Sequence, residues 1–237
     1  MNFDELAEYL AEATLVPSNS SEPYVIHYEL DDGEDGLRYS LFISSDEIIN
    51  RFLCQPAEDE VMFALDHTYQ LTVEDIPMMM VGQLQQTKHF IPFLCVLQNR
   101  EDKEAFDVVL NYIKDKRQVP PVAILGDASK AFSASIKEQL PDTIRLTCWF
   151  HMIKAVRIRA QVVRANNGTV YNDIYEDLKS VHFHVYDSVM FNLVMGLFLR
   201  KYSEEYTFYD DDLKHETLKL IRYIMDTWAR DTSVNCW

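Results

Sequence analysis

The amino-acid sequence predicts an α/β fold, a mixed β-sheet with flanking helices, followed by an all-helical region. Between residues 38 and 165, short apolar runs bounded by turn residues alternate with segments whose apolar residues recur at helical spacing. Beyond residue 170 only helical spacing remains. Two of the apolar runs also end in an aspartate, Asp66 and Asp127. These observations predict a sheet that delivers carboxylates at the ends of its strands.

The N-terminal part is predicted to begin with a helix over 2–13, where apolar residues recur at helical spacing. Residues 14–37 combine a proline, a Ser/Asn run and an acidic stretch, and are predicted to be a linker or hairpin outside the core. Alternation predicts a strand over 38–44, and Ser45 is predicted to cap the short helix that follows.

The central region is predicted to supply most of the sheet. Apolar runs predict strands at 61–65, 78–84, 90–97, 122–125 and 144–147. Helical spacing predicts helices at 101–116, 129–140 and 148–165. The resulting order, β-β-β-α-β-α-β-α, gives a mixed sheet with helices packed on its faces.

Composition and charge narrow the function classes. The longest apolar stretch is too short to span a bilayer, and the acidic N-terminus is unlike a signal peptide. Four cysteines lie far apart, which is typical of reduced thiols. We therefore expect a nuclear or cytoplasmic protein that is not secreted and has no membrane partner.

The net charge of −16 is distributed unevenly along the chain. Residues 1–60 hold 15 acidic and 2 basic side chains, residues 61–165 hold 11 and 13, and residues 166–237 hold 12 and 7. Five bases gather late in the central region, at Arg145, Lys154, Arg157, Arg159 and Arg164. Such a basic helix suits phosphates, although an ordinary solvated helix face has the same composition.

Asp66 in VMFALDHTY and Asp127 in PPVAILGDASKAF are candidate metal ligands, because hard cations take carboxylate oxygens. The alternative for Asp127 is that it caps the following helix. Cys148 and His151 in CWFH share one helix face. Alternatives for that pair are half of a zinc site or a Cys–His nucleophile.

Taken together, LDHTYQLT, ILGDASKAF and CWFH resemble, in this order and spacing, the catalytic core of Mutator-like (MULE) transposases, which have a ribonuclease-H-like fold. The resemblance implies metal-dependent DNA cleavage and strand transfer, with Mg²⁺ or Mn²⁺ held by Asp66 and Asp127. It implies that His151 contacts the scissile phosphate and that Cys148 packs structurally. The neighbouring Phe150 is expected in the core. His67 departs from the glycine that is usual in the family.

Strand transfer of this class uses two metal ions and a third carboxylate, which in the family is a glutamate beyond a helical insertion. The acids of the helical region stand in contexts unlike that glutamate, namely Glu204, Glu205, Glu216 and Asp226. The chain is therefore expected to be incomplete for catalysis. We divide it into an acidic segment 1–37, a ribonuclease-H-like core 38–165 and a helical region 166–237, interpreted as a truncated insertion domain.

The first hypothesis is a transposase-derived protein with DNA as its partner. The alternative is a non-catalytic, domesticated module that binds a protein or DNA, since the acidic N-terminal segment suits a protein partner or a homo-oligomer better than it suits DNA. An unrelated α/β enzyme is a third possibility. The expected geometry is that Asp66 and Asp127 face each other across adjacent strands and that His151 points toward them.

Overall fold

The computed structural model describes residues 3–33, 36–53, 61–68, 76–85, 89–117, 119–185, 187–208 and 210–229. The chain divides into two compact units, residues 1–145 and residues 146–237. This division falls twenty residues before the boundary at residue 165 that we drew from the sequence. The first is called the sheet unit and the second the helical unit.

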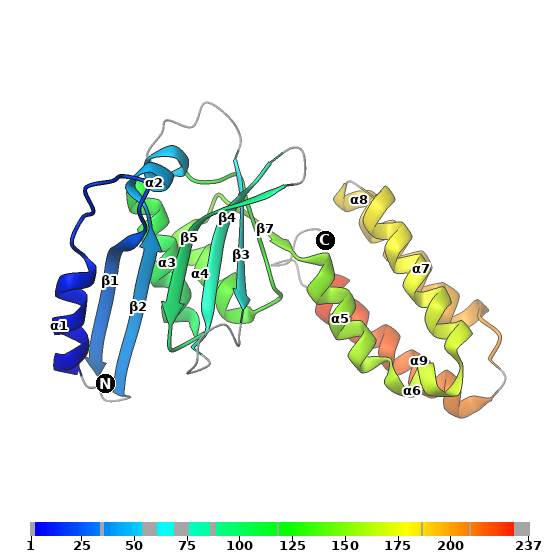
Figure 1. The fold of residues 1–237 in the computed structure, drawn as a ribbon. Coiled ribbons are helices and arrows are strands. Elements are labelled where there is room, and N and C mark those ends of the chain that lie inside the picture. The colour runs from blue at the N-terminus through cyan, green and yellow to red at the C-terminus, as the bar shows by residue number, and fades with distance from the viewer. Residues whose placement is uncertain are drawn as a thin grey trace. The chain divides into compact units, whose positions relative to one another are not determined.

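A seven-stranded sheet has the order β1-β2-β5-β4-β3-β6-β7 (Figure 1). Its strands are β1 Tyr24–Gly33, β2 Gly36–Ser44, β3 Met62–Thr68, β4 Met78–Leu84, β5 Phe90–Gln98, β6 Ala123–Gly126 and β7 Ile144–Thr147. From β1 to β3 along this order, neighbouring strands are antiparallel. β6 joins β3 in parallel, so the sheet is mixed, as predicted.

Four helices accompany the strands of the sheet unit: α1 Phe3–Ala13, α2 Asp46–Phe52, α3 Lys103–Lys116 and α4 Lys130–Gln139. Side-chain caps fix where three of them begin: Ser45 accepts from the Ile48 amide for α2, Asp102 from the Ala105 amide for α3, and Ser129 from the Phe132 amide for α4. In Figure 1, α3 and α4 lie on one face of the sheet.

The main core fills the space between the sheet and the helices α3 and α4. Phe63 of β3, Val109 of α3 and Phe132 of α4 belong to one buried cluster that also includes side chains of β2, β4, β5 and β6. Strand alternation sends every second side chain of β3 into this cluster, so Phe63 and Leu65 are buried whereas Asp66 is exposed. The side of β3 that faces away from this cluster therefore carries Asp66.

The N-terminal segment is a hairpin and not a linker. β1 pairs with β2 from Tyr24 to Gly33, so the residues that we set apart as 1–37 contribute the edge strand of the sheet. α1 packs there with Leu6 and Leu10 against Val25 in a small separate cluster.

The helical unit contains α5 Trp149–Arg159, α6 Gln161–Asn166, α7 Gly168–His184, α8 Ser188–Arg200 and α9 Asp211–Ile224, with π-helical turns η1 Lys201–Glu205 and η2 Met225–Ala229. The single helix predicted over 148–165 is therefore divided at Ala160. The predicted architecture, a mixed sheet with flanking helices followed by a helical region, is confirmed. Among the described residues, no helix is long and apolar enough to cross a membrane.

Candidate functional site

The candidate site lies at the end of the sheet where the C-termini of three strands come together. β3 and β5 are both antiparallel to β4, and β6 is parallel to β3. The C-terminal ends of β3, β5 and β6 therefore meet at the same edge. Residues that follow these three strands are brought together by topology, although they are far apart in the sequence.

Asp66 lies near the end of β3, and Asp127 follows directly after the adjacent parallel strand β6. The last pair in the register of these strands is Ala64 of β3 with Leu125 of β6. Each aspartate lies two residues beyond its member of that pair, so a continued register would bring Asp66 and Asp127 opposite each other. Asp66 is exposed and Asp127 is half-buried. That the two carboxylates face each other stays a prediction.

The turn that carries Asp127 is held from two sides. The Asp127 carboxylate accepts a hydrogen bond from the backbone amide of Ser129 at 3.0 Å, while Ser129 itself caps α4. The guanidinium of Arg145 donates to the backbone carbonyl of Asp127 and lies 4.4 Å from the centre of the Phe132 ring. Arg145 is only 5% exposed. Ser129, and not Asp127, is therefore the helix cap, and Asp127 is positioned by its neighbours.

Gly126 is required at this turn because there is no space for a side chain. A Cβ atom at residue 126 would lie 2.3 Å from the Phe132 ring and 3.1 Å from the carbonyl oxygen of Leu65. Both contacts are shorter than ordinary van der Waals distance. The glycine thus allows α4 to approach β3 directly beside Asp127.

His67 feels the charge of a third carboxylate, Glu101, as well as the charges of the two aspartates. Its ring packs edge-on against Phe106 of α3, with the ring centres 5.3 Å apart. Burial lowers the pKa of His67, while the negative charges of Glu101, Asp127 and Asp66 act in the opposite direction. Glu101 was not among the candidate residues predicted from the sequence. The available signal was its position just after β5, the third strand that ends at this edge.

The donor set of this edge suits a hard cation, since carboxylate oxygens are the ligands that Mg²⁺ and Mn²⁺ prefer. Asp66 and Asp127 offer two such groups, near the end of β3 and just after β6. Within the ranges that the structure describes, however, no group of three or more His, Cys, Asp or Glu side chains is gathered as a metal site. The same finding gives no support to the zinc alternative for Cys148 and His151.

Cys148 and His151 belong to the helical unit. Cys148 is half-buried at the N-cap position of α5, and its thiol makes no capping hydrogen bond. Trp149 stacks on His182 of α7, with ring centres 4.5 Å apart and planes 5° apart. Phe150, expected in the core, is instead 65% exposed, because the α5 face that carries it is not covered within the helical unit. The orientation of His151 toward the aspartates stays a prediction.

Three of the four acids that we weighed as a third carboxylate, namely Glu204, Glu205 and Glu216, form ion pairs. Arg200 contacts Glu204 at 3.9 Å and Glu205 at 2.7 Å, and Lys219 contacts Glu216 at 2.6 Å. The two partners of each pair lie within five residues of each other in the sequence. Ion pairs of this kind at the surface contribute little to stability.

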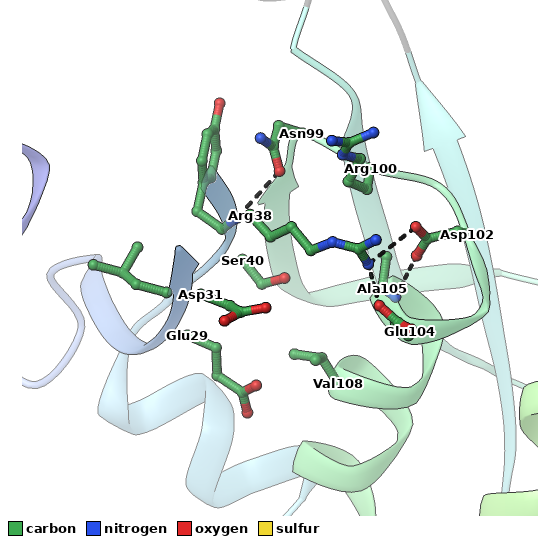
Figure 2. A pocket seen from close by; sticks show the side chains of 12 residues that line it. Glu29, Asp31, Arg38, Ser40, Asn99, Arg100, Asp102, Glu104, Ala105 and Val108 are labelled. Atoms are coloured by element: carbon green, nitrogen blue, oxygen red, sulfur yellow. Dashed lines mark hydrogen bonds and ion pairs between the residues drawn. The ribbon is translucent and has the colours of Figure 1, made fainter. Parts of the chain in front are cut away.

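Arg38 forms ion pairs beside a cavity near the edge strands β1 and β2. This cavity of about 190 Å³ lies between the β1–β2 hairpin and the start of α3, and Figure 2 shows the side chains that line it. The Arg38 guanidinium binds Asp102 at 3.2 Å and also Glu104. Asn99 accepts from the Tyr39 amide at 3.1 Å and donates to a backbone carbonyl of β2. These contacts neutralise the cavity's main cation and tie β2 to α3, which indicates a structural role.

Comparison with known proteins agrees with the sequence resemblance. The model of the MULE transposase domain matches residues 62–155. The Drosophila P element transposase in its strand transfer complex is similar at 14% identity with a TM-score of 0.33, over 95% of this chain and 58% of that chain. No curated protein matches. The matched residues include Asp66, Asp127 and the Cys148–His151 motif.

Proposed function

We propose that the chain is a transposase-derived protein of the Mutator-like group whose functional centre is the pair Asp66 and Asp127. The observation that supports this most directly is the parallel pairing of β3 and β6, since Asp66 and Asp127 each lie two residues beyond the last pair, Ala64 and Leu125. The match to the MULE transposase domain covers both residues. The ancestral activity is metal-dependent DNA cleavage and strand transfer, and DNA inside the cell is the proposed partner.

In this proposal Asp66 and Asp127 hold a divalent cation, Mg²⁺ or Mn²⁺. The ion would supply Lewis-acid polarisation of a phosphate oxygen. Arg145 and the Ser129 amide position Asp127 through its carbonyl and its carboxylate, so the ligand is oriented before an ion binds. The Glu101 charge adds to the negative potential that attracts the cation.

We further propose that this chain does not perform strand transfer by itself. That reaction positions two metal ions, which requires ligands beyond one pair of carboxylates. In this proposal His151 contacts the scissile phosphate, Cys148 packs structurally, and the helical region 166–237 corresponds to part of an insertion domain.

The test measures the affinity for Mn²⁺ by calorimetry and by electron paramagnetic resonance. Asp66→Asn and Asp127→Asn should each weaken binding by about tenfold or more, because each removes one of two charged ligands. Asp142→Asn is the matched control, since Asp142 is an exposed carboxylate of the same unit. Equal Mn²⁺ affinity in all four proteins would rule the site out.

Catalysis is tested separately with DNA carrying element ends. With Mg²⁺ or Mn²⁺ the protein should cleave no more than its Asp66→Ala/Asp127→Ala variant does. Cleavage that disappears in this variant would show that the chain completes the site with another acid.

A non-catalytic protein-binding module is the second candidate. The observation that favours it is the acidity of residues 1–60, with 15 acidic and 2 basic side chains. A basic protein partner would then bind without involving Asp66 or Asp127, so the asparagine variants would bind that partner as well as the unaltered chain.

A further inference from the structure

A long stretch of this acidic chain contains no acidic residue. Between Asp142 and Asp173 there is neither aspartate nor glutamate, although the chain as a whole has 38 such residues and a net charge of −16. The same stretch contains five arginines and lysines. One of them, Arg145, is buried beside Asp127 in the sheet unit. The other four lie on α5 and α6.

The four remaining cations are exposed and are not neutralised by neighbouring carboxylates: Lys154, Arg157, Arg159 and Arg164. None of them forms an ion pair with a residue that the structure describes. Other cations of the helical unit differ, since Lys179 pairs with Glu176 and Lys201 with Asp177. The positive charge of α5 and α6 is therefore available to bind a ligand.

Two of these cations, Lys154 and Arg157, are three residues apart on α5, a spacing that places both on one face of that helix. The helix is interrupted at Ala160, whose amide forms the last bond of α5, to Val156, and whose carbonyl accepts the first bond of α6, from Arg164. Arg164 is still brought near Arg157, because both cations act on the phenol of Tyr171. We call the three cations Lys154, Arg157 and Arg164 the basic stripe.

A cleft opens at the end of the basic stripe. It has a volume of about 420 Å³ and lies between α6 and the first turns of α7, lined by Gln161, Arg164, Ala165, Gly168, Tyr171 and Asn172. The Arg164 guanidinium lies 5.0 Å from the centre of the Tyr171 ring. Burial raises the pKa of Tyr171, whereas Arg164 and Arg157 oppose this, so both cations lie near the phenol.

The chemistry of the cleft complements a phosphodiester. Guanidinium and amide donors bind phosphate oxygens, and a tyrosine ring offers a surface on which a base or sugar can pack. The cleft also includes Gly168 at the N-terminus of α7, whose helix dipole favours negative charge. No heavy atom lies within 4 Å of a Cβ built at Gly168, so a ligand can approach the backbone there.

We propose that the basic stripe, Lys154, Arg157 and Arg164, together with the cleft beside Tyr171, binds the sugar–phosphate backbone of nucleic acid. The proposal rests on the proposed function and assigns its DNA contact to a defined surface.

The experiment measures binding of a fluorescent DNA duplex by anisotropy between 50 and 200 mM salt. Arg157→Gln/Arg164→Gln should lower the affinity at least tenfold and reduce the slope of log K against log salt by about 2, one per lost phosphate contact. Arg157→Lys/Arg164→Lys should keep most of the slope because it keeps both charges. Lys179→Gln/Lys219→Gln removes two charges elsewhere in the helical unit and should bind as the unaltered chain does.

Circular dichroism of each variant separates lost contacts from lost folding, and Mn²⁺ binding measured on the same samples reports on Asp66 and Asp127 independently. Unchanged affinity and slope in Arg157→Gln/Arg164→Gln would overturn the basic stripe as the DNA contact. Failure of the unaltered chain to bind DNA at 50 mM salt would overturn it as well. In either case retained Mn²⁺ binding would leave the metal site standing.

Discussion

The sheet unit and the helical unit differ most in charge. Residues 1–145 contain 26 acidic and 11 basic side chains, a net charge of −15, whereas residues 146–237 contain 12 and 11, a net charge of −1. The carboxylate pair lies in the first unit and the basic stripe in the second. The overall charge of −16 therefore argues against nucleic acid only for the sheet unit, and a charge argument has to be made unit by unit.

The two units also differ in how completely they cover their apolar side chains. In the sheet unit Phe42, Phe63 and Phe132 are essentially inaccessible to solvent. On α8 of the helical unit, Val189 is 77% exposed and Leu193 is 59% exposed. The difference shows that apolar spacing alone predicts a helix but does not predict that its apolar face is covered.

The largest effect is expected from truncating one leucine in each unit. Leu110→Ala opens a cavity in the sheet-unit core and should cost about 2–5 kcal/mol of unfolding free energy. Leu193→Ala, at an exposed position, should change it by less than about 0.5 kcal/mol. Urea unfolding followed by circular dichroism measures both. All three tryptophans lie beyond residue 145, so their fluorescence follows the helical unit. Equal costs for the two variants would contradict the difference in packing.

Adding a single methyl group at a glycine should lower the free energy of unfolding of the sheet unit and raise that of the helical unit. Gly126→Ala forces a Cβ against the Phe132 ring and should destabilise the sheet unit by about 1–3 kcal/mol. Gly196→Ala, within α8, meets no heavy atom within 4 Å and should stabilise the helix by about 1 kcal/mol. Thermal unfolding curves show both shifts. A stabilising Gly126→Ala would mean that α4 does not approach β3 as closely as described.

Glu101→Gln tests whether the negative charge of Glu101 strengthens the proposed binding of Mn²⁺ by Asp66 and Asp127. Removal of one nearby charge at a partly solvated edge should weaken Mn²⁺ binding about three- to fivefold, less than Asp127→Asn. Asp115→Asn, an exposed carboxylate at the other end of α3, should have no effect. A loss equal to that of Asp127→Asn would make Glu101 a direct ligand, and no loss would limit its influence to His67.

The smallest effect concerns alkaline pH. The Tyr24 hydroxyl donates to Asp46 at 2.7 Å, which raises the pKa of Tyr24 from its ordinary value of 10 to about 12. The folded chain keeps a proton that the unfolded chain loses, so this stabilisation is complete below pH 10 and disappears as the pH rises to 12. Solvent screening limits it to less than about 1 kcal/mol. Tyr24→Phe should flatten the decline of unfolding free energy between pH 10 and 12, and an unchanged decline would exclude this contribution.

The order of elements could be predicted because each strand carries its own signal. The strand at 78–84 is found with the predicted limits, and the capping role of Ser45 is confirmed. Glu101 was missed because it lies in a polar turn, Asn99–Asp102, without an apolar pattern of its own. Only the sheet order brings that turn to the edge where β3 and β6 end. The exposure of Phe150 also escaped prediction, since it depends on which helix faces are covered and not on residue type.

The register between β3 and β6 has a consequence for how such a protein loses its function over evolutionary time. The ladder that pairs Ala64 with Leu125 is formed by backbone groups, so substitutions in the surrounding helices leave it in place. If Asp66 and Asp127 hold a cation as we propose, loss of a more distant acid would abolish strand transfer without disturbing the ladder. Affinity for a cation would then outlive the reaction that it once served, and a bound ion in such a descendant would record ancestry and be no measure of DNA cleavage.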